Sequence, residues 1–222
     1  MARYAIGDVH GCARTLAALV ARIAPAPDDH LVFLGDYIDR GPDTPGVIDF
    51  LIDLTGRTRC TFLRGNHDQL MLDALAGLRG AAYDAWIARN GGDATMRQYG
   101  ARGGVPDAHA AFLRDTLLAF DAPEAAYVHA GLDPHRSVAE QMAAPDEETL
   151  LWSRDHLRVR PSTVVWEKPV VFGHTPRPEP LIAAPLIGLD TGCVYGPTRP
   201  DLGRLCALRM DDATVFLEPY RG

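Results

Sequence analysis

The chain has 222 residues, of which 47% are hydrophobic and 23% charged, which is ordinary for a soluble globular protein with a sizeable core. Its formal net charge is −7 and it has no run of five basic residues, so we exclude a nonspecific nucleic-acid binder. No apolar run of about 18 residues and no signal-peptide pattern is present, so we expect a cytoplasmic protein that does not act at a membrane.

The first third of the chain alternates predicted strands and helices. The expected strands are residues 3–6, 31–34 and 61–63, and the expected helices are residues 12–23, 47–54 and 69–78. Strand–helix–strand repeats imply right-handed crossovers and a parallel or mixed sheet. Such a sheet binds its ligands beyond the carboxyl ends of the strands.

The middle of the chain has a different character. Residues 77–122 are rich in alanine and interrupted by glycine, and they carry no strand pattern. We expect helices over residues 81–88 and 108–120, which form a helical insert within a single domain spanning residues 1–222. Residues 134–169 read as mixed loop and helix.

The chain then returns to strands. These are expected at residues 125–128, 170–172, 186–189, 205–209 and 214–217. The last three are separated by turns and predict an antiparallel meander. Residues 197–201 form an exposed loop that contains proline.

The four cysteines are scattered along the chain, and none forms a Cys-x-x-Cys pair. In a chain of this size, that pattern predicts free thiols in a reducing compartment. Cys12 and Cys193 lie next to the motifs described below, but cysteine is commonly a small buried residue. No functional role is therefore assigned to them.

Five short segments bring metal-binding and acid–base residues to loop positions, and most of them directly follow an apolar run. The segments are Gly7-Asp8-Val9-His10-Gly11, Gly35-Asp36-Tyr37-Ile38-Asp39-Arg40-Gly41, Gly65-Asn66-His67-Asp68, His129-Ala130-Gly131 and Gly173-His174-Thr175. The candidate ligands are Asp8, His10, Asp36, Asn66, His129 and His174. A mixed nitrogen and oxygen set of this size is sufficient for two adjacent divalent metals.

Each motif alone also has a simpler structural explanation. Asp and Gly are common in turns, and a single His at a strand end usually needs only a hydrogen-bond partner. Arg40 alone could form a surface ion pair, and Asp39 could cap a turn. The combination favours a site, because the motifs follow strands, are flanked by glycine and together supply ligands for two metals.

The remaining motif residues have natural second roles. His67 lies beside a candidate ligand and suits a general acid for the leaving oxygen. Asp39 is placed to hydrogen-bond His67 and favour its protonated form. Arg40 offers a planar fork for two phosphate oxygens. Two metals with a spare acid and a spare cation indicate a phosphoester hydrolase.

The ordered series of motifs resembles the phosphoprotein-phosphatase branch of the calcineurin-like metallophosphoesterases. The similarity runs from Gly7 to about Tyr195 and is greatest to the small bacterial and phage enzymes of the lambda-phosphatase type. The segment Leu150-Leu151-Trp152-Ser153-Arg154 resembles the one that carries their second phosphate-binding arginine, which implies that role for Arg154. The insert, with Asn90-Gly91-Gly92, is also similar to theirs.

The resemblance implies an α/β fold, namely a two-sheet β-sandwich flanked by helices with the site at its edge. It implies that the first metal is held by Asp8, His10 and Asp36, and the second by Asp36, Asn66, His129 and His174. It also implies that phosphate is held by Arg40, Arg154 and Asn66, and that the acid is His67 paired with Asp39. The two divalent metals are expected to be Mn²⁺ in vitro, with Fe or Zn as alternatives.

The resemblance leaves the substrate open between two classes. Residues 189–196 are very similar to a segment of bacterial diadenosine tetraphosphate hydrolases of the same superfamily. Those symmetrical hydrolases typically lack an acidic residue at the place of Asp39, and here residues 197–202 resemble an insertion into a turn that is usually tight.

We therefore predict a phosphomonoesterase that uses direct attack of a metal-bridging hydroxide on phosphoserine, phosphothreonine or also phosphotyrosine. Its partner is then a phosphorylated protein or a small phosphoester. A dinucleoside polyphosphate hydrolase is the alternative. A non-catalytic phosphate-binding module is a third reading, disfavoured because every expected ligand is present.

Overall fold

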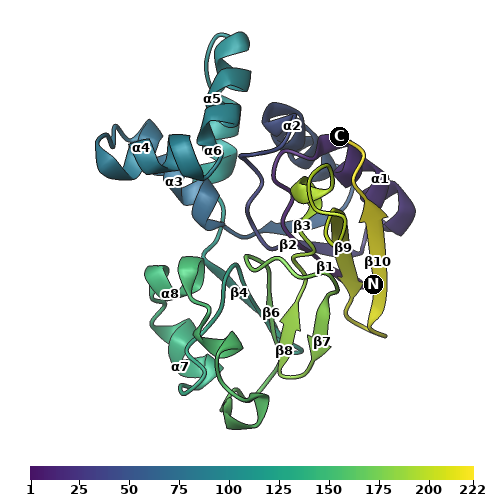
Figure 1. Ribbon diagram of the computed structural model, residues 1–222. Coiled ribbons are helices and arrows are strands. Elements are labelled where there is room, and N and C mark those ends of the chain that lie inside the picture. The colour runs from purple at the N-terminus through teal and green to yellow at the C-terminus, as the bar shows by residue number, and fades with distance from the viewer.

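The computed structural model describes residues 1–222, and its centre is a pair of five-stranded sheets (Figure 1). The first sheet has the order β10-β9-β1-β2-β3, with strands β1 (Arg3–Ile6), β2 (His30–Phe33), β3 (Arg59–Phe62), β9 (Arg204–Arg209) and β10 (Thr214–Pro219). The second has the order β4-β5-β6-β8-β7, with strands β4 (Ala119–Asp121), β5 (Ala126–Val128), β6 (Val170–Phe172), β7 (Leu181–Ala183) and β8 (Leu186–Gly188). Both sheets are mixed, because each combines parallel and antiparallel pairs.

The alternation of side chains along the strands builds the layers of the fold. In β2, Leu31 and Phe33 belong to the core beneath helices α1 (Ala13–Ile23) and α2 (Thr44–Leu54), whereas Val32 belongs to the core between the two sheets. A third core lies between the second sheet and helices α7 (Val138–Ala143) and α8 (Glu147–Trp152). The result is a helix–sheet–sheet–helix sandwich, which confirms the expected fold class.

The expected insert contains three helices, α4 (Ala81–Arg89), α5 (Gly92–Ala101) and α6 (Asp107–Arg114), preceded by α3 (Asn66–Leu75). Of these, α5 was not predicted, although α4 was. Trp86, Tyr99 and Leu113 from the insert belong to the same core as the first sheet and its helices. We therefore propose that residues 1–222 form one domain into which residues 77–122 are inserted.

The prediction of a helix over residues 108–120 was wrong at its C-terminal end. The helix stops at Arg114, and residues 119–121 form β4, which pairs with β5 in the second sheet. The helix ends because the chain pairs with β3 and its end instead. The Leu117 amide donates to the Phe62 carbonyl, and the Leu117 carbonyl accepts from the Arg64 amide. Local propensity cannot reveal such a long-range pairing.

The predicted meander of the last three strands was also wrong in part. Strands β9 and β10 do form an antiparallel pair, but β8 lies in the other sheet, parallel to β6 and antiparallel to the unpredicted β7. The reason is the long connection after β8, which crosses the edge of the sandwich before Arg204 instead of making a tight turn. The proline-containing loop at residues 197–201 within this connection is exposed, as expected.

All four cysteines are free thiols, and three of them, Cys12, Cys193 and Cys206, are buried. This agrees with the expectation of unpaired cysteines. None of the helices has both the length and the apolar character needed to span a lipid bilayer.

His156 is fully buried in the core between the second sheet and helices α7 and α8. Its ring packs edge-to-face on Phe172 with centroids 4.5 Å apart, and neither ring nitrogen has a hydrogen-bond partner in the protein. It fills the space beside Gly131, where a Cβ would lie 2.2 Å from the ring. Burial lowers the pKa of His156 to about 4.

We expect this burial to make the stability of the protein sensitive to acid. Because the folded pKa is lower than the unfolded one, the unfolded chain binds more protons between about pH 6.5 and 4, so stability falls as the pH falls through that window. His156→Phe should remove this dependence on pH. Measured by denaturant unfolding, the free energy of unfolding of the variant should rise relative to that of the wild type by about 1 kcal/mol for each pH unit between about pH 6 and pH 4. His135→Gln, at an exposed position, is the control. Parallel stability curves for wild type and His156→Phe would contradict the prediction.

Candidate metal centre

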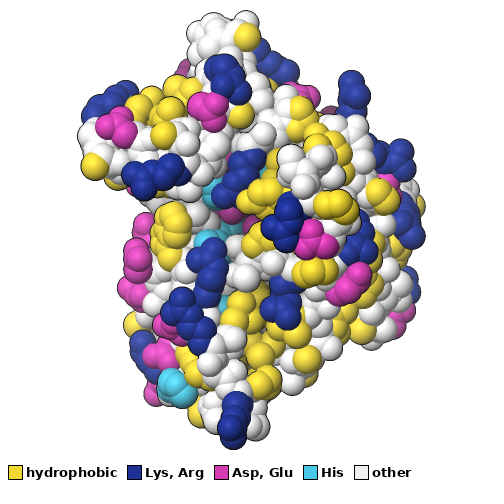
Figure 2. Space-filling view, viewed as in Figure 1, with side chains coloured by type: hydrophobic (Ala, Val, Ile, Leu, Met, Phe, Trp, Pro, Cys, Tyr) yellow, Lys and Arg dark blue, Asp and Glu magenta, His cyan; other side chains and the backbone are white.

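The predicted site residues converge where strands of the two sheets end (Figure 1). Asp8 follows β1, Asp36 follows β2 and Asn66 begins α3 after β3, whereas His129 and His174 follow β5 and β6. Figure 2 shows histidine side chains in a hollow of the surface that is bordered by basic side chains. The first sheet therefore supplies the oxygen ligands and His10, and the second sheet supplies the other two imidazoles.

The backbone at this site is unusual. Seven residues other than glycine have positive φ, and five of them are predicted site residues: His10, Asp36, Asp39, Arg40 and His174. L-residues adopt this left-handed conformation at a cost of about 1–2 kcal/mol each, so the surrounding structure must hold it. Part of that support is direct, because the backbone amides of Val9 and His10 both donate to the Asp36 carbonyl, at 3.1 and 2.8 Å. Such concentrated strain is typical of functional sites.

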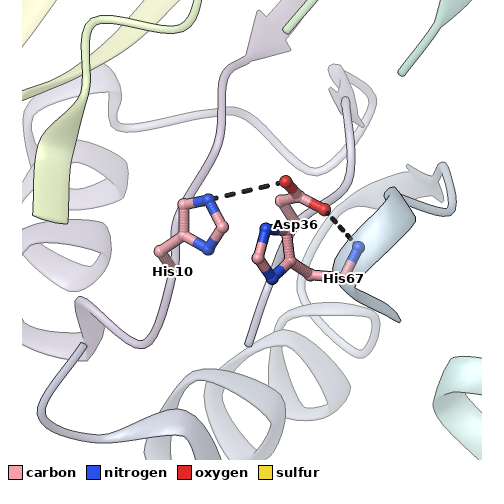
Figure 3. Close-up of side chains that lie close together, drawn as sticks. All are labelled: His10, Asp36 and His67. Carbon is pink, nitrogen blue, oxygen red and sulfur yellow. Dashed lines mark hydrogen bonds and ion pairs between the residues drawn. The ribbon is translucent and has the colours of Figure 1, made fainter. Parts of the chain in front are cut away.

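The Asp36 carboxylate lies at the centre of the site. Its Oδ2 is 3.5 Å from the Nε2 of His10 and 3.5 Å from the Nε2 of His129. Its Oδ1 accepts a hydrogen bond from the His67 backbone amide at 3.0 Å, and Figure 3 shows the carboxylate between this amide and the His10 ring. One carboxylate thus faces ligand groups from both halves of the site.

The imidazoles are oriented by hydrogen bonds on their other nitrogens. Nδ1 of His10 lies 2.7 Å from the Ile38 carbonyl, and Nδ1 of His129 lies 2.8 Å from the Leu34 carbonyl. Each Nδ1–H therefore donates to a carbonyl, which leaves each Nε2 unprotonated and 3.5 Å from Asp36. Burial lowers the pKa of both rings, and it lowers the pKa of His174 to about 2. All three are consequently neutral, which is the form that binds metal.

Two groups of buried side chains could each hold a cation. The first combines His10, Asp36 and His67, and the second combines Asp36, His129 and His174, with ligand atoms within 4.8 Å of one another in each group. Asp8, which was predicted as a ligand, is in neither group, and its carboxylate accepts the His174 backbone amide at 3.0 Å, whereas His67, which was predicted as the acid, is in the first group. Asn66 joins the second group, since its Oδ1 lies 3.0 Å from Nε2 of His129 and 2.9 Å from Nδ1 of His174. Asp36 is the residue common to both groups.

The charges of the site indicate that cations belong there. Asp8, Asp36 and Asp190 are all buried in one region, and the pKa of Asp8 is raised by burial and by the neighbouring Asp190 and Asp36 carboxylates. Burial raises the pKa of Asp190 to about 7. Buried anions crowded in this way are stabilised when divalent cations bind among them. The mixed imidazole, carboxylate and amide donors suit Mn²⁺, Fe²⁺ or Zn²⁺ and do not choose between them.

His67 and Asp39 form the predicted pair. Nδ1 of His67 lies 2.6 Å from Oδ2 of Asp39, and both side chains are buried. This contact holds the ring so that Nε2 faces the cavity. Arg40 lies on the same side, with its two terminal nitrogens 2.6 Å from Nε2 of His10 and 2.8 Å from Nε2 of His67.

The structure places Arg154 on the opposite side of the cavity from Arg40. Its Nε donates to the Thr175 hydroxyl at 3.2 Å, and one terminal nitrogen is 3.5 Å from the His174 carbonyl. Both arginines line a cavity of about 150 Å³ together with four of the candidate ligands, His10, Asp36, Asn66 and His174. An anion in this cavity would therefore meet one guanidinium from each half of the site.

The cavity also contains residues that sequence reasoning did not place in the site. Its further lining residues are Asn90, Trp152, Pro176, Asp190 and Tyr195. Asp190 could have been predicted by the same rule as the ligands, because it closely follows β8 at the carboxyl end of a parallel strand. The others come from loops and an insert helix end whose positions no local pattern reveals.

Comparison with known proteins identifies the family. Residues 1–205 match the family model described as calcineurin-like phosphoesterase, and the chain belongs to this family. It is 31% identical over 198 residues to serine/threonine-protein phosphatase 1 of Salmonella typhimurium, covering 87% of each chain. It is 28% identical to the symmetrical bis(5'-nucleosyl)-tetraphosphatase of a Janthinobacterium species, covering 97% of this chain and 95% of the relative.

Solved structures share the fold of this chain. A crystal structure described as a proposed diadenosine tetraphosphatase superposes with a TM-score of 0.71 at 24% identity, covering 100% of this chain and 94% of that one. This similarity confirms the metallophosphoesterase fold. The metallophosphoesterase assignment is thus established, and the curated relatives divide between phosphoprotein and nucleotide substrates.

We expect Mn²⁺ to titrate two sites per chain. Asp8→Asn should weaken one site and His174→Ala the other, by roughly tenfold or more, since each removes one donor. Asp36→Asn should weaken both, because its carboxylate faces both groups. Isothermal titration calorimetry measures the number of Mn²⁺ sites and their affinities. Asp212→Asn, in an exposed turn, is the control. A single Mn²⁺ per wild-type chain, or an Asp36→Asn variant that keeps both sites, would contradict the arrangement.

We expect Arg154→Ala to weaken inhibition by inorganic phosphate. A guanidinium–phosphate contact is a charge-assisted hydrogen bond worth about 1.5–3 kcal/mol, which corresponds to roughly 10- to 100-fold in the inhibition constant. Arg158→Ala is the matched control, because Arg158 is exposed and lies outside the cavity lining. If phosphate inhibits both variants as strongly as it inhibits the wild type, Arg154 does not contact phosphate.

Proposed function

We propose that this metallophosphoesterase is a phosphomonoesterase that acts on phosphoserine and phosphothreonine in proteins, with phosphotyrosine as a further substrate. The first metal would be held by Asp8, His10 and Asp36, and the second by Asp36, Asn66, His129 and His174. The observation that carries the metal assignment is the position of the Asp36 carboxylate, which is 3.5 Å from an imidazole Nε2 of each group. The phosphate would be bound by Arg40, Arg154 and Asn66.

The chemistry follows from groups already placed. When bound, two divalent cations supply positive charge to the phosphoryl oxygens and acidify the attacking water. Arg40 and Arg154 neutralise the phosphoryl oxygens from the two sides of the cavity. His67 would protonate the departing oxygen from Nε2 once a bound phosphate draws the Arg40 guanidinium away from that nitrogen, and Asp39 fixes the ring through Nδ1.

The acid pair supports a monoester as substrate. The alkoxide that leaves from phosphoserine is a strong base and needs a proton, whereas a nucleotide leaving from a polyphosphate is a weak base and needs it less. The buried contact between His67 and Asp39 is therefore most useful for alkyl esters. The relative named serine/threonine-protein phosphatase 1 supports the same choice.

A dinucleoside polyphosphate hydrolase is the second candidate. It is supported by the relatives named bis(5'-nucleosyl)-tetraphosphatase and by the segment at residues 189–196. Asp190 and Tyr195 of that segment line the cavity, so the similarity falls on residues that a substrate would meet. The metal chemistry would be the same for both candidates.

A side-by-side assay distinguishes the two substrates. We expect a higher kcat/KM for a phosphothreonine peptide than for diadenosine tetraphosphate under the same Mn²⁺ conditions, because only the former needs the acid pair. The reverse order by tenfold or more would assign the chain to the nucleotide enzymes and leave the metal site intact.

His67→Asn tests the acid itself. We expect kcat for a phosphothreonine peptide to fall by about 10²–10⁴, with a much smaller loss for 4-nitrophenyl phosphate, whose phenol leaves without a proton. Mn²⁺ binding should be retained, because His67 is assigned as the acid and not as a ligand. Equal losses on both substrates would argue that His67 positions another group instead.

A further inference from the structure

Asp39 is completely buried, and its carboxylate has three side-chain partners. Besides His67, Oδ2 accepts a hydrogen bond from the indole Nε1 of Trp86 at 2.6 Å, and Oδ1 accepts one from the Thr95 hydroxyl at 2.7 Å. The Thr95 oxygen also lies 2.9 Å from the Asp39 backbone amide. Trp86 lies on α4 and Thr95 on α5, so both partners come from the helical insert.

The insert also supports the residue that follows. The Arg40 amide donates to the Gly91 carbonyl at 3.2 Å, and a Cβ on Gly91 would lie 2.6 Å from Cγ of Arg40. Asp39 and Arg40 are consecutive residues with φ of 71° and 64°. The turn between α4 and α5 thus contacts the backbone at the point where it is held in the left-handed region.

The contacts that form this support are close-packed. Trp86 and Thr95 are buried, and a Cβ on Gly92 would lie 2.5 Å from the indole ring. The indole therefore has one available position, and its N–H points at Asp39. With both oxygens engaged, the carboxylate cannot rotate without leaving a buried group unsatisfied.

We propose that Trp86 and Thr95 are positioning residues that orient Asp39 toward His67, and that the insert thereby determines how well the site protonates poor leaving groups. This inference rests on the proposed function, because it assigns a purpose to the acid pair. It predicts that damage to the insert changes the ranking of substrates and does not simply lower all rates. Neither residue lines the cavity, and the hydrogen bonds of their side chains go to Asp39 and Thr44.

The test compares two leaving groups across conservative variants. Thr95→Val removes the hydroxyl without changing the shape of the side chain, Trp86→Phe removes the indole N–H, and Thr95→Ser restores the hydroxyl. We expect Thr95→Val and Trp86→Phe to lower kcat for a phosphothreonine peptide by roughly 10- to 100-fold and kcat for 4-nitrophenyl phosphate by less than about threefold. Thr95→Ser should return the ratio of the two rates to within about threefold of wild type.

Tyr99→Phe is the matched control. Tyr99 is buried on α5, the helix that carries Thr95, and its hydroxyl contacts His109 at 3.0 Å and not Asp39. Removal of the Tyr99 hydroxyl should change kcat for the phosphothreonine peptide and kcat for 4-nitrophenyl phosphate by the same factor. Mn²⁺ binding by each variant, measured by calorimetry, shows whether the fold and the metal centre are retained.

The outcomes separate this inference from the proposed function. If His67→Asn discriminates between the two substrates but Thr95→Val and Trp86→Phe lower both rates equally or not at all, the positioning role is wrong and the acid assignment stands. If His67→Asn does not discriminate, the acid assignment is wrong and the inference falls with it. Selective loss in Thr95→Val and Trp86→Phe, restored in Thr95→Ser, supports the inference.

Discussion

The structure depends most on the placement of one buried carboxylate, that of Asp36. A charged group in this position is costly unless its surroundings supply donors and positive charge. The loop that carries it is fixed by Asp68, whose carboxylate accepts the backbone amides of Asp36, Tyr37 and Gly65 at 2.9, 3.1 and 2.8 Å. Gly65 is needed there, because a Cβ would lie 2.0 Å from Oδ1 of Asp36. The Gly-Asn-His-Asp motif therefore supports the Asp36 loop in addition to carrying Asn66, the ligand that we propose.

The sandwich determines how far apart the two halves of the site lie. The first sheet carries Asp8, His10 and Asp36, and the second carries His129 and His174, so packing between the sheets fixes their separation. Hydrogen bonds also cross this junction directly. Nδ1 of His129 contacts the Leu34 carbonyl, and the His174 amide donates to Asp8 at 3.0 Å. Fold and site are thus coupled, because the core between the sheets fixes the separation of the residues that we propose as ligands.

Sequence reasoning predicted which side chains lie near one another where the pattern is local. Asp8, Asp36, Asn66, His129 and His174 each lie at or soon after the end of a strand, and these ends meet at one edge of the sandwich. It failed where the deciding contact is distant along the chain. The residues that hold Asp39, namely Trp86 and Thr95, are about 50 positions away, and no periodicity links them to it. For the same reason, β4 was taken for helix and β8 was placed with the wrong partners.

Anomalous X-ray diffraction from crystals grown with Mn²⁺ would show whether the Asp36 carboxylate is shared by two metals, as we propose. Data collected at the manganese absorption edge should show two peaks about 3.5–4 Å apart. One peak should lie between Asp36 and His10, and the other between Asp36 and His129. A single peak, or two peaks that do not share the Asp36 carboxylate, would contradict the proposal that Asp36 is a ligand of both metals.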